Sequence, residues 1–175
     1  MIRRAFTEPD NDTFLRLYKT FIRPHLEYAN VIWNPYLKRQ SVLIEQVQRR
    51  ATKILKNCKE MSYAERLRFL NLHSLKGRRL RGDLIQMFKI YHGIDDIDFH
   101  KLFISAPISS TRNSAGKIFV KHANSNKRLY SFCFRIVKPW NDLPEKVKFS
   151  KTVNEFKNRI DKLPQLCDKF YCYDE

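Results

Sequence analysis

The chain has 175 residues, a net charge of +16, and 43% hydrophobic and 13% aromatic residues. That apolar content is sufficient for one domain with a core and excludes disorder along the whole chain. Only four glycines are present, which argues against an all-β sandwich with its many tight turns, so the composition predicts a mainly α fold.

The first predicted helix begins near Asp12, whose carboxylate can cap the free amides of the next turn. Apolar or aromatic residues recur at three- and four-residue steps and predict a buried face: Phe14, Leu17, Phe21, His25, Tyr28 and Ile32. Pro24 lacks a backbone donor, so we expect a kink or break near Arg23. Asn34-Pro35 should end this run.

The second predicted helix runs from about Ser41 to Lys56 and has an apolar side and a basic side. The predicted core residues are Leu43, Ile44, Val47, Ala51, Ile54 and Leu55. Arg49, Arg50, Lys53 and Lys56 occupy neighbouring positions on about two helical turns, so their charges can follow a phosphate backbone. The alternative is a solubilising face without a ligand.

Two further helices follow, each with a predicted cap. Ser62 and Glu65 form a capping-box pattern before a short third helix that should bury Leu67 and Leu70. Ser74 can cap a fourth helix, which Gly93 ends and whose apolar face comprises Leu80, Leu84, Met87, Phe88 and Tyr91. The start of that helix carries a second basic group, Lys76, Arg78, Arg79 and Arg81, although Arg79 could simply pair with Asp83.

The composition of the sequence and its predicted elements change after Gly93. Residues 105–114 are rich in Ser, Thr and Asn and predict a linker, and residues 117–121 predict a short strand. A basic turn at Lys127 and Arg128 leads to a helix that Pro139 should end, with Trp140 and Leu143 folding back. A capping box at Thr152 opens a last helix, whose apolar stripe comprises Val153, Phe156, Ile160 and Leu163.

These elements predict four parts. A helical bundle spans residues 12–93, a connector spans 94–116, a small α+β part spans 117–164, and a tail spans 165–175. The positive charge is concentrated in two blocks: residues 38–82 hold thirteen basic and three acidic residues, and residues 112–151 hold ten and two. Such blocks favour a nucleic-acid partner, with an anionic membrane or no ligand as the alternatives. Tyr18, Tyr36 and Trp140 could stack on bases, but aromatic residues beside helical stripes are more often core.

No catalytic residue, metal site or cofactor site is predicted. Asp95-Asp96 follow a helix stop, outside any strand-like run, which indicates a solvated loop rather than metal-binding aspartates. Cys167 and Cys172 make one loose pair, whereas structural zinc needs four ligands. A pairing of Cys133 with His122 stays open beside the simpler reading of Cys133 as a buried thiol. The chain has no secretory signal or membrane-spanning run, so we expect free thiols and an intracellular location, in the nucleus or cytoplasm.

Five stretches resemble, in order, the landmarks of one protein family: LYKTFIRPHLEYANVIWNP, QVQRRATKIL, SYAERLRFLNLHSLKGRRLRGDLIQMFKIYHGID, VKPWNDLP and TVNEFKNRID. Together they resemble reverse transcriptases of non-LTR retrotransposons, particularly the Jockey-like clades, over roughly Thr13 to Leu163. The resemblance implies the thumb and following C-terminal region, a helical element that grips the template–primer duplex. The family's fingers, its palm with the aromatic-Ala-Asp-Asp motif that binds Mg²⁺, and its endonuclease have no counterpart here, so the resemblance implies a fragment.

The function that follows is nucleic-acid binding without polymerase activity of its own. The resemblance places duplex contacts on the helix with Arg49, Arg50, Lys53 and Lys56, and less directly on Arg78, Arg79 and Arg81. The expected partners are an RNA–DNA or DNA duplex, held through its phosphates, and the palm domain of a parent polymerase. The alternatives are a non-catalytic protein-interaction module and an inert relic of a transposable element.

Overall fold

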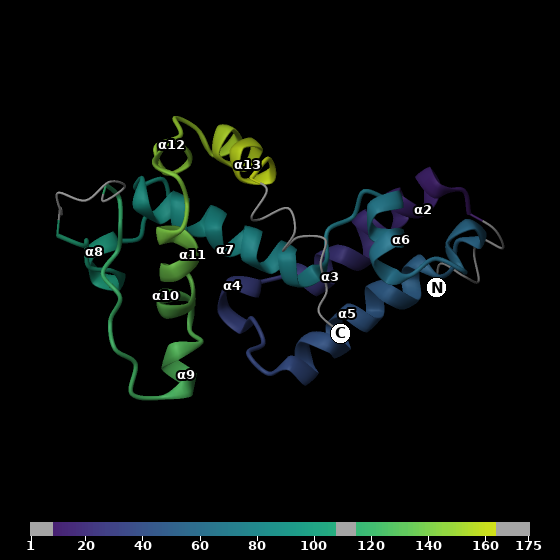
Figure 1. Cartoon of the computed structure of the whole chain (residues 1–175), viewed down its shortest axis with the longest axis horizontal. Helices are drawn as coiled ribbons and strands as arrows, with labels where there is room; N and C mark the ends of the chain where they lie inside the picture. The colour runs from purple at the N-terminus through teal and green to yellow at the C-terminus, as the bar shows by residue number, and fades with distance from the viewer. Residues whose placement is uncertain (1–8, 108–114, 164–175) are drawn as a thin grey trace. The chain divides into compact units, whose positions relative to one another are not determined.

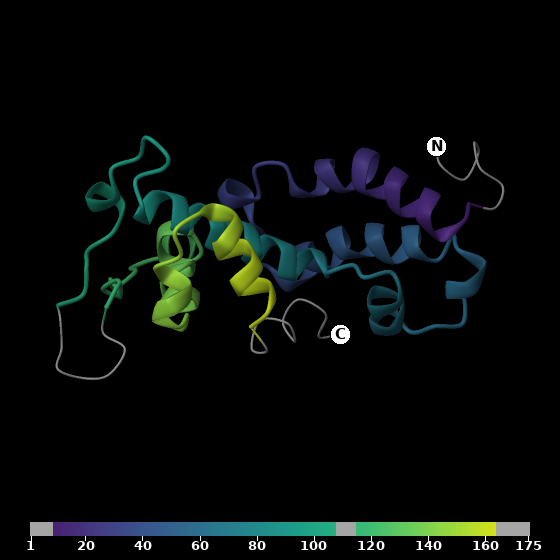
Figure 2. The ribbon, with the colours of Figure 1, turned by 90° about the horizontal axis from the view of Figure 1, so that it is seen from above.

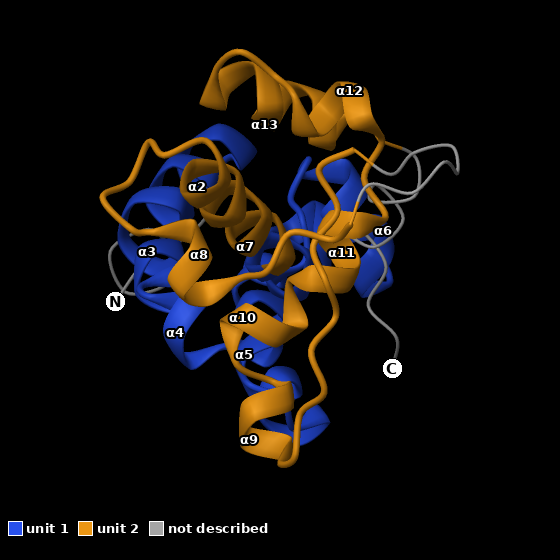
Figure 3. Ribbon diagram, turned by 90° about the vertical axis from the view of Figure 1, so that its left-hand side faces the viewer, with its two compact units in different colours: residues 1–79, 164–175 blue, residues 80–163 orange. Residues whose placement is uncertain are grey.

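The computed structural model describes residues 9–107 and 115–163 (Figure 1). This part of the chain is mainly helical, which confirms the predicted fold class. Its residues form two compact units, 9–79 and 80–163, the second with the gap at 108–114 (Figure 3). The predicted tail, Cys167, Cys172 and most of the predicted linker lie outside the described residues, and the four-part division stays a prediction.

The helices of the first unit follow one another closely along the chain. They are α2 (Asn11–Leu17), the π-helix η1 (Tyr18–Ile22), α3 (Arg23–Glu27), α4 (Asn30–Trp33), α5 (Lys38–Thr52), the 3-10 helix η2 (Lys56–Cys58), α6 (Tyr63–Phe69) and the first turn of α7 (Leu75–Tyr91). The N-cap of α2 is Asp10 rather than the predicted Asp12, because the Asp10 carboxylate accepts from the backbone of Thr13 at 3.3 Å.

The π-helix explains why the predicted face of the first helix was wrong. The N–H of Arg23 bonds to the carbonyl of Tyr18, five residues back, so this turn is wider than an α-helical one. Residues four apart then share a face, and Phe14 and Tyr18 are buried with Ile22 packed against them. Four residues of the predicted face are exposed instead: Phe21, His25, Tyr28 and Ile32. The expected disruption near Arg23 is confirmed, since the π-helix η1 interrupts α-helical bonding and a new α-helix, α3, starts at Arg23 with Pro24 in its first turn.

The core of the first unit lies where α2 and η1 run beside α5 (Figures 1 and 2). Phe14 and Tyr18 stack with ring centroids 5.9 Å apart. They belong to one cluster of buried side chains with Ala51, Leu55, Cys58, Tyr63, Leu67, Leu70 and Leu72. The capping box of α6 is confirmed: Ser62 Oγ accepts from the Glu65 backbone, and the Glu65 carboxylate accepts from the Ser62 backbone.

The inward side of α5 is polar, contrary to prediction. Glu45, Gln48 and Thr52 are buried. Leu43 and Val47, which were predicted as core, are exposed, whereas Ala51 and Leu55 are buried as predicted. The helix presents its polar side inward because every one of these buried groups finds a hydrogen-bond partner there, so the cost of taking it out of water is offset.

The second unit contains the rest of α7 and a series of short helices. These are α8 (Phe99–Leu102), α9 (Asn126–Leu129), α10 (Phe132–Arg135), α11 (Val137–Asn141), α12 (Glu145–Lys148) and α13 (Val153–Asp161). Trp140 and Leu143 are buried, Trp140 within α11 rather than after a helix end. The predicted stripe of α13 is confirmed at Phe156 and Ile160, and the Phe156 ring stacks on Phe88 with centroids 4.4 Å apart.

Two predictions in the second unit were wrong. The segment 117–121 is not a strand: in the described residues it pairs through one isolated antiparallel bridge, between Ile118 and Ser105. The amide of Asn141 occupies the other side of Ile118, accepting from its N–H and donating to its carbonyl at 2.9 Å each, so a further strand has no place there. Pro139 does not end a helix but lies in the first turn of α11, where its missing N–H would be unbonded anyway.

Candidate functional site

A groove of about 820 Å³ in the first unit brings several of the predicted basic residues together. It is lined by Pro9, Asp10, Asn11, Arg50, Lys53, Ile54, Leu55, Lys56, Asn57 and Lys59. All four of its cations, Arg50, Lys53, Lys56 and Lys59, are exposed. We call these four side chains the cationic groove.

The end of α5 sets the geometry of the cationic groove. The helix ends at Thr52 and Lys53 is its C-cap, so the basic residues do not continue along a helix as predicted. The chain turns instead, with the Ile54 N–H bonded to the Ala51 carbonyl, and then forms the single 3-10 turn η2, which begins at Lys56. Cations are favoured at a helix C-terminus because the last carbonyl groups carry partial negative charge.

Among the described lining residues, one is an acid, Asp10. Hydrogen bonds from Thr13 lower the pKa of Asp10, so this carboxylate is ionised at neutral pH. Four cations against one carboxylate give the described part of the lining a net positive charge. It therefore attracts an anion, and its open shape suits an extended one better than a small enclosed ligand.

Arg49 takes a different position from its neighbours. Its guanidinium lies 4.8 Å from the centre of the Tyr63 ring, on which Arg66 also lies, at 5.5 Å. Arg49 is half-buried there and does not line the groove. The sequence predicted Arg49 as part of the basic row, but its guanidinium makes a cation–π contact with the Tyr63 ring.

The first-unit cations of α7 are divided between surface and interior. Lys76 is exposed. Arg78 donates to both oxygens of Glu27, at 2.9 Å for the Nη2–Oε2 pair. Arg79 is buried and donates to Ser41 Oγ at 2.7 Å, which corrects its prediction as a phosphate contact, because a side chain 2% exposed cannot reach a duplex.

The remaining predicted cations belong to the second unit. Arg81 is engaged in a bidentate pair with Asp161, at 2.7 and 2.8 Å. Lys127 and Arg128 are exposed on α9, and the Arg128 guanidinium lies 5.3 Å from the centre of the Phe134 ring. Of the ten predicted site residues, Arg50, Lys53 and Lys56 thus meet in one groove. Lys59 was missed, although its basic side chain follows the row after one turn.

A buried polar network holds α5 in place beside the groove. The Glu45 carboxylate accepts from Tyr63 Oη at 2.5 Å and from the backbone of Leu75 at 3.0 Å, at the start of α7. Gln48 accepts from Tyr18 Oη and donates to Tyr63 Oη and to the carbonyl of His73. Burial raises the pKa of Glu45, and burial together with the nearby Glu45 charge raises the pKa of Tyr63.

The aromatic residues weighed as base-stacking platforms have different positions. Tyr18 is buried and donates to Gln48 at 2.5 Å, and Trp140 is buried and donates to the Gly116 carbonyl at 2.9 Å. Neither can stack on a base. Tyr36 is about half exposed, at 49%, but it does not line the cationic groove.

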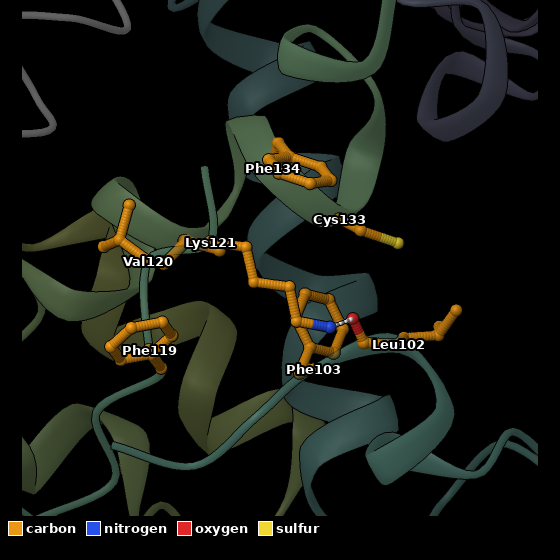
Figure 4. Close-up of a pocket in the computed structure, with 8 residues that line it drawn as sticks. Leu102, Phe103, Phe119, Val120, Lys121, Cys133 and Phe134 are labelled. Atoms are coloured by element: carbon orange, nitrogen blue, oxygen red, sulfur yellow. Dashed lines mark hydrogen bonds between the residues drawn. The ribbon is translucent and has the colours of Figure 1, made fainter. Parts of the chain in front are cut away.

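A second cavity lies in the second unit and is too small for a ligand (Figure 4). It holds about 20 Å³ and is lined mainly by apolar side chains, including Phe103, Phe119 and Cys133. A single water needs roughly 10–15 Å³ by this measure. Lys121 donates to the Leu102 carbonyl at its edge, at 3.5 Å. Burial raises the pKa of the Cys133 thiol, so this thiol is not an activated nucleophile. The ring of His122, which the sequence left open as a partner of Cys133, contacts the side chain of Asn124.

Among residues 9–107 and 115–163, no group of His, Cys, Asp and Glu side chains could hold a metal ion. Asp95 of the acidic loop accepts from Gln86 at 2.7 Å and Asp96 is exposed.

The same described residues contain no helix with the length and apolar character needed to cross a bilayer. Comparison with protein-family models, curated proteins and solved structures gave no match to this chain.

Proposed function

We propose that this protein binds the phosphate backbone of nucleic acid through the cationic groove. The observation that carries the proposal is the meeting of Arg50, Lys53, Lys56 and Lys59 around one open groove. Each phosphate neutralised there releases condensed counterions, which gives an affinity that tolerates any sequence and falls with salt. The net charge of +16 for the chain adds a long-range attraction to the same partner.

The preferred form of the ligand is a duplex, RNA–DNA or DNA. Single-strand binders combine cations with aromatic platforms for the bases. Among the described residues that line the cationic groove none is aromatic, so this part of the lining offers contacts to the backbone and none of the stacking that splayed bases require. A duplex presents its phosphates at regular spacing, and the cations gathered at the end of α5 can contact them without reaching a base.

The family resemblance supports the same function. It leads us to propose that the chain acts as a thumb and C-terminal segment of a non-LTR reverse transcriptase, next to a palm domain and inside the cell, in the nucleus or cytoplasm. In that role the chain grips a duplex and uses no cofactor, and Mg²⁺ chemistry belongs to the palm. Primer extension by this chain alone is expected to give no product.

The test measures duplex affinity by fluorescence anisotropy across a salt series. For three to four neutralised phosphates, log Kd against log salt should have a slope of about 3 to 4, so affinity falls roughly 100-fold between 50 and 200 mM salt. Arg50→Ala/Lys53→Ala should lower affinity at least about tenfold and reduce the slope by about 2.

A matched control is Lys19→Ala/Arg68→Ala, which removes two exposed cations from the same unit outside the groove. This variant should retain the slope of the wild type. Equal losses in both variants would mean that overall charge, rather than the groove, holds the duplex. A binding constant insensitive to salt would end the proposal.

A further inference from the structure

Two arginines of the first unit share the carboxylate of Glu27. Arg78, in the first turn of α7, donates from Nε to Glu27 Oε1 and from Nη2 to Oε2. Arg23 lies one helical turn before Glu27 on α3, and its Nε is 3.7 Å from the same Oε1 atom. Both guanidinium groups therefore converge on a single oxygen. We call Arg23 and Arg78 the Glu27 arginine pair.

The charges of this cluster are not balanced. Two guanidinium groups against one carboxylate leave a net charge of +1. Arg81 in the second unit provides a comparison, because it has a carboxylate of its own and donates to both oxygens of Asp161 at 2.7 and 2.8 Å. The Glu27 arginine pair has one cation more than its carboxylate can neutralise.

Arg23 is the member of the pair whose donors are unused. At 3.7 Å its contact with Glu27 is too long for a hydrogen bond. Within residues 9–107 and 115–163, no acceptor lies within hydrogen-bond distance of its guanidinium group. The Arg23 side chain is 25% exposed, so it is largely withdrawn from bulk water but an anion from solution can still reach it.

The electrostatic surroundings of Arg23 favour an added anion. Burial and the nearby Arg78 charge lower the pKa of Arg23, while a guanidinium group stays protonated at neutral pH. Two like charges are thus held close together in a partly desolvated place, where an anion would relieve their repulsion. Glu27 opposes such an anion, but its charge is offset by the bidentate contact with Arg78.

The free donors indicate which anion fits. Arg78 uses Nε and Nη2 on Glu27 and keeps Nη1 for another acceptor, while Arg23 offers its whole fork of N–H groups. Donors from two side chains suit an anion with several free oxygens. A terminal phosphate has three of them and a charge of about −1.5 to −2 at neutral pH. A phosphodiester has only two free oxygens and a single charge.

We propose that the Glu27 arginine pair binds a terminal phosphate group, supplied by free phosphate or by a phosphomonoester. This site differs from the cationic groove, whose described lining residues include neither arginine and whose proposed ligand is a diester backbone. Phosphate binding here does not depend on nucleic-acid binding there.

The experiment titrates the full chain with inorganic phosphate, methyl phosphate and dimethyl phosphate at constant ionic strength. Nitrogen–proton NMR signals of the Arg23 and Arg78 Nε–H groups report on the site directly. Inorganic phosphate and methyl phosphate should shift both signals, and dimethyl phosphate should bind at least about tenfold more weakly, because it lacks the second charge and the third oxygen. Equal affinity for the first two probes would support a phosphomonoester as a source, and weaker binding of methyl phosphate would support free phosphate.

Three variants test the roles of the charges. Arg23→Gln removes no hydrogen bond from the described structure, so it should fold, and it should lower phosphate affinity at least about tenfold. Glu27→Gln removes the opposing charge and should raise phosphate affinity several-fold, which general damage to the fold could not do. Arg16→Gln is the matched control, because it removes one exposed cation from α2 of the same unit, and it should bind phosphate as the wild type does.

Three results would overturn the inference. The first is equal affinity for inorganic phosphate and dimethyl phosphate. The second is an equal loss of phosphate affinity in Arg23→Gln and Arg16→Gln, which would assign the binding to overall charge. The third is phosphate binding that leaves the Arg23 Nε–H signal unmoved.

The two proposed sites are told apart by exchanging their variants. Arg23→Gln should bind a duplex with 5′-hydroxyl ends as the wild type does. Arg50→Ala/Lys53→Ala should bind inorganic phosphate at the Glu27 arginine pair as the wild type does, since neither residue belongs to that pair. Failure of one proposal therefore leaves the measurement of the other intact.

Discussion

The phenolic hydroxyl of Tyr63 donates a 2.5 Å hydrogen bond to the carboxylate of Glu45, and both side chains are buried. Tyr63→Phe leaves a buried carboxylate with one donor fewer, so we expect the free energy of unfolding to fall by about 2 kcal/mol. Urea unfolding followed by circular dichroism measures the change. Tyr28→Phe removes a hydroxyl from an exposed ring and should have no measurable effect. A loss of equal size in both variants would contradict the role of the buried bond.

Glu45 should make stability depend on pH. Burial raises its pKa above the usual 4.5, so the folded state holds the proton more tightly than the unfolded state does. Stability from this group is fully present below pH 4.5 and is lost as pH rises through the folded-state pKa. Glu45→Gln cannot ionise, so its stability relative to the wild type should improve as pH rises from 4.5. Unfolding midpoints of both proteins across a pH series test this, and parallel pH curves would refute it.

The ion pair of Asp83 and Arg135 should contribute strongly to the second unit. Arg135 Nε and Nη2 each donate to Asp83 at 2.9 Å, and the Asp83 side chain is only 4% exposed. Asp83→Ala leaves a cation with little access to water and should cost about 3 kcal/mol. The double variant with Arg135→Ala should recover part of that loss. Arg159→Ala breaks an exposed pair with Glu155 and should cost less than about 1 kcal/mol.

Phe156 should be a sensitive position in the second unit. Its ring is fully buried, stacks on Phe88 and lies 6.2 Å from Trp140 between ring centres. Phe156→Ala removes those contacts and leaves a cavity, so we expect a loss of about 3–5 kcal/mol in chemical unfolding. Phe149→Ala, at a half-exposed ring, provides the comparison and should cost less than about 1 kcal/mol.

Lys59 and Arg49 should differ in nucleic-acid binding. Lys59 lines the cationic groove, so Lys59→Ala should lower the slope of log Kd against log salt by about 1. Arg49 lies on the Tyr63 ring, so Arg49→Ala should reduce stability and leave the slope unchanged. Titrations with the same duplex in at least four salt concentrations measure both. A lower slope only in Arg49→Ala would favour the basic row predicted from sequence over the groove.

Local patterns in the sequence predicted the fold where a single turn or stripe decides it. The capping box at Ser62 and Glu65 and the stripe with Phe156 and Ile160 depend on neighbours within a few residues, and both were confirmed. The side of α5 that faces inward was predicted wrongly. Glu45 and Gln48 are buried because they bond to Tyr63 and to the backbone at His73 and Leu75, and a hydrophobicity pattern contains no record of such distant partners.

The candidate site was predictable in composition but not in arrangement. The cations Arg50, Lys53 and Lys56 stand out in the sequence, yet the prediction of one helix through Lys56 required them to form a straight row. The early end of α5 turns them around a groove and brings Lys59 to it. For Arg79, burial could not be foreseen, because its partner Ser41 lies on another helix.

The side-chain amide of Asn141 takes the place that a neighbouring strand would occupy beside Ile118. On that side, the backbone N–H and C=O of Ile118 are already bonded within the same molecule. A strand from another chain therefore finds nothing to pair with there, although Phe119 and Val120 next to it are exposed and have high β-propensity. By occupying both backbone groups of Ile118, this one side-chain amide should limit edge-to-edge pairing beside two exposed residues of high β-propensity.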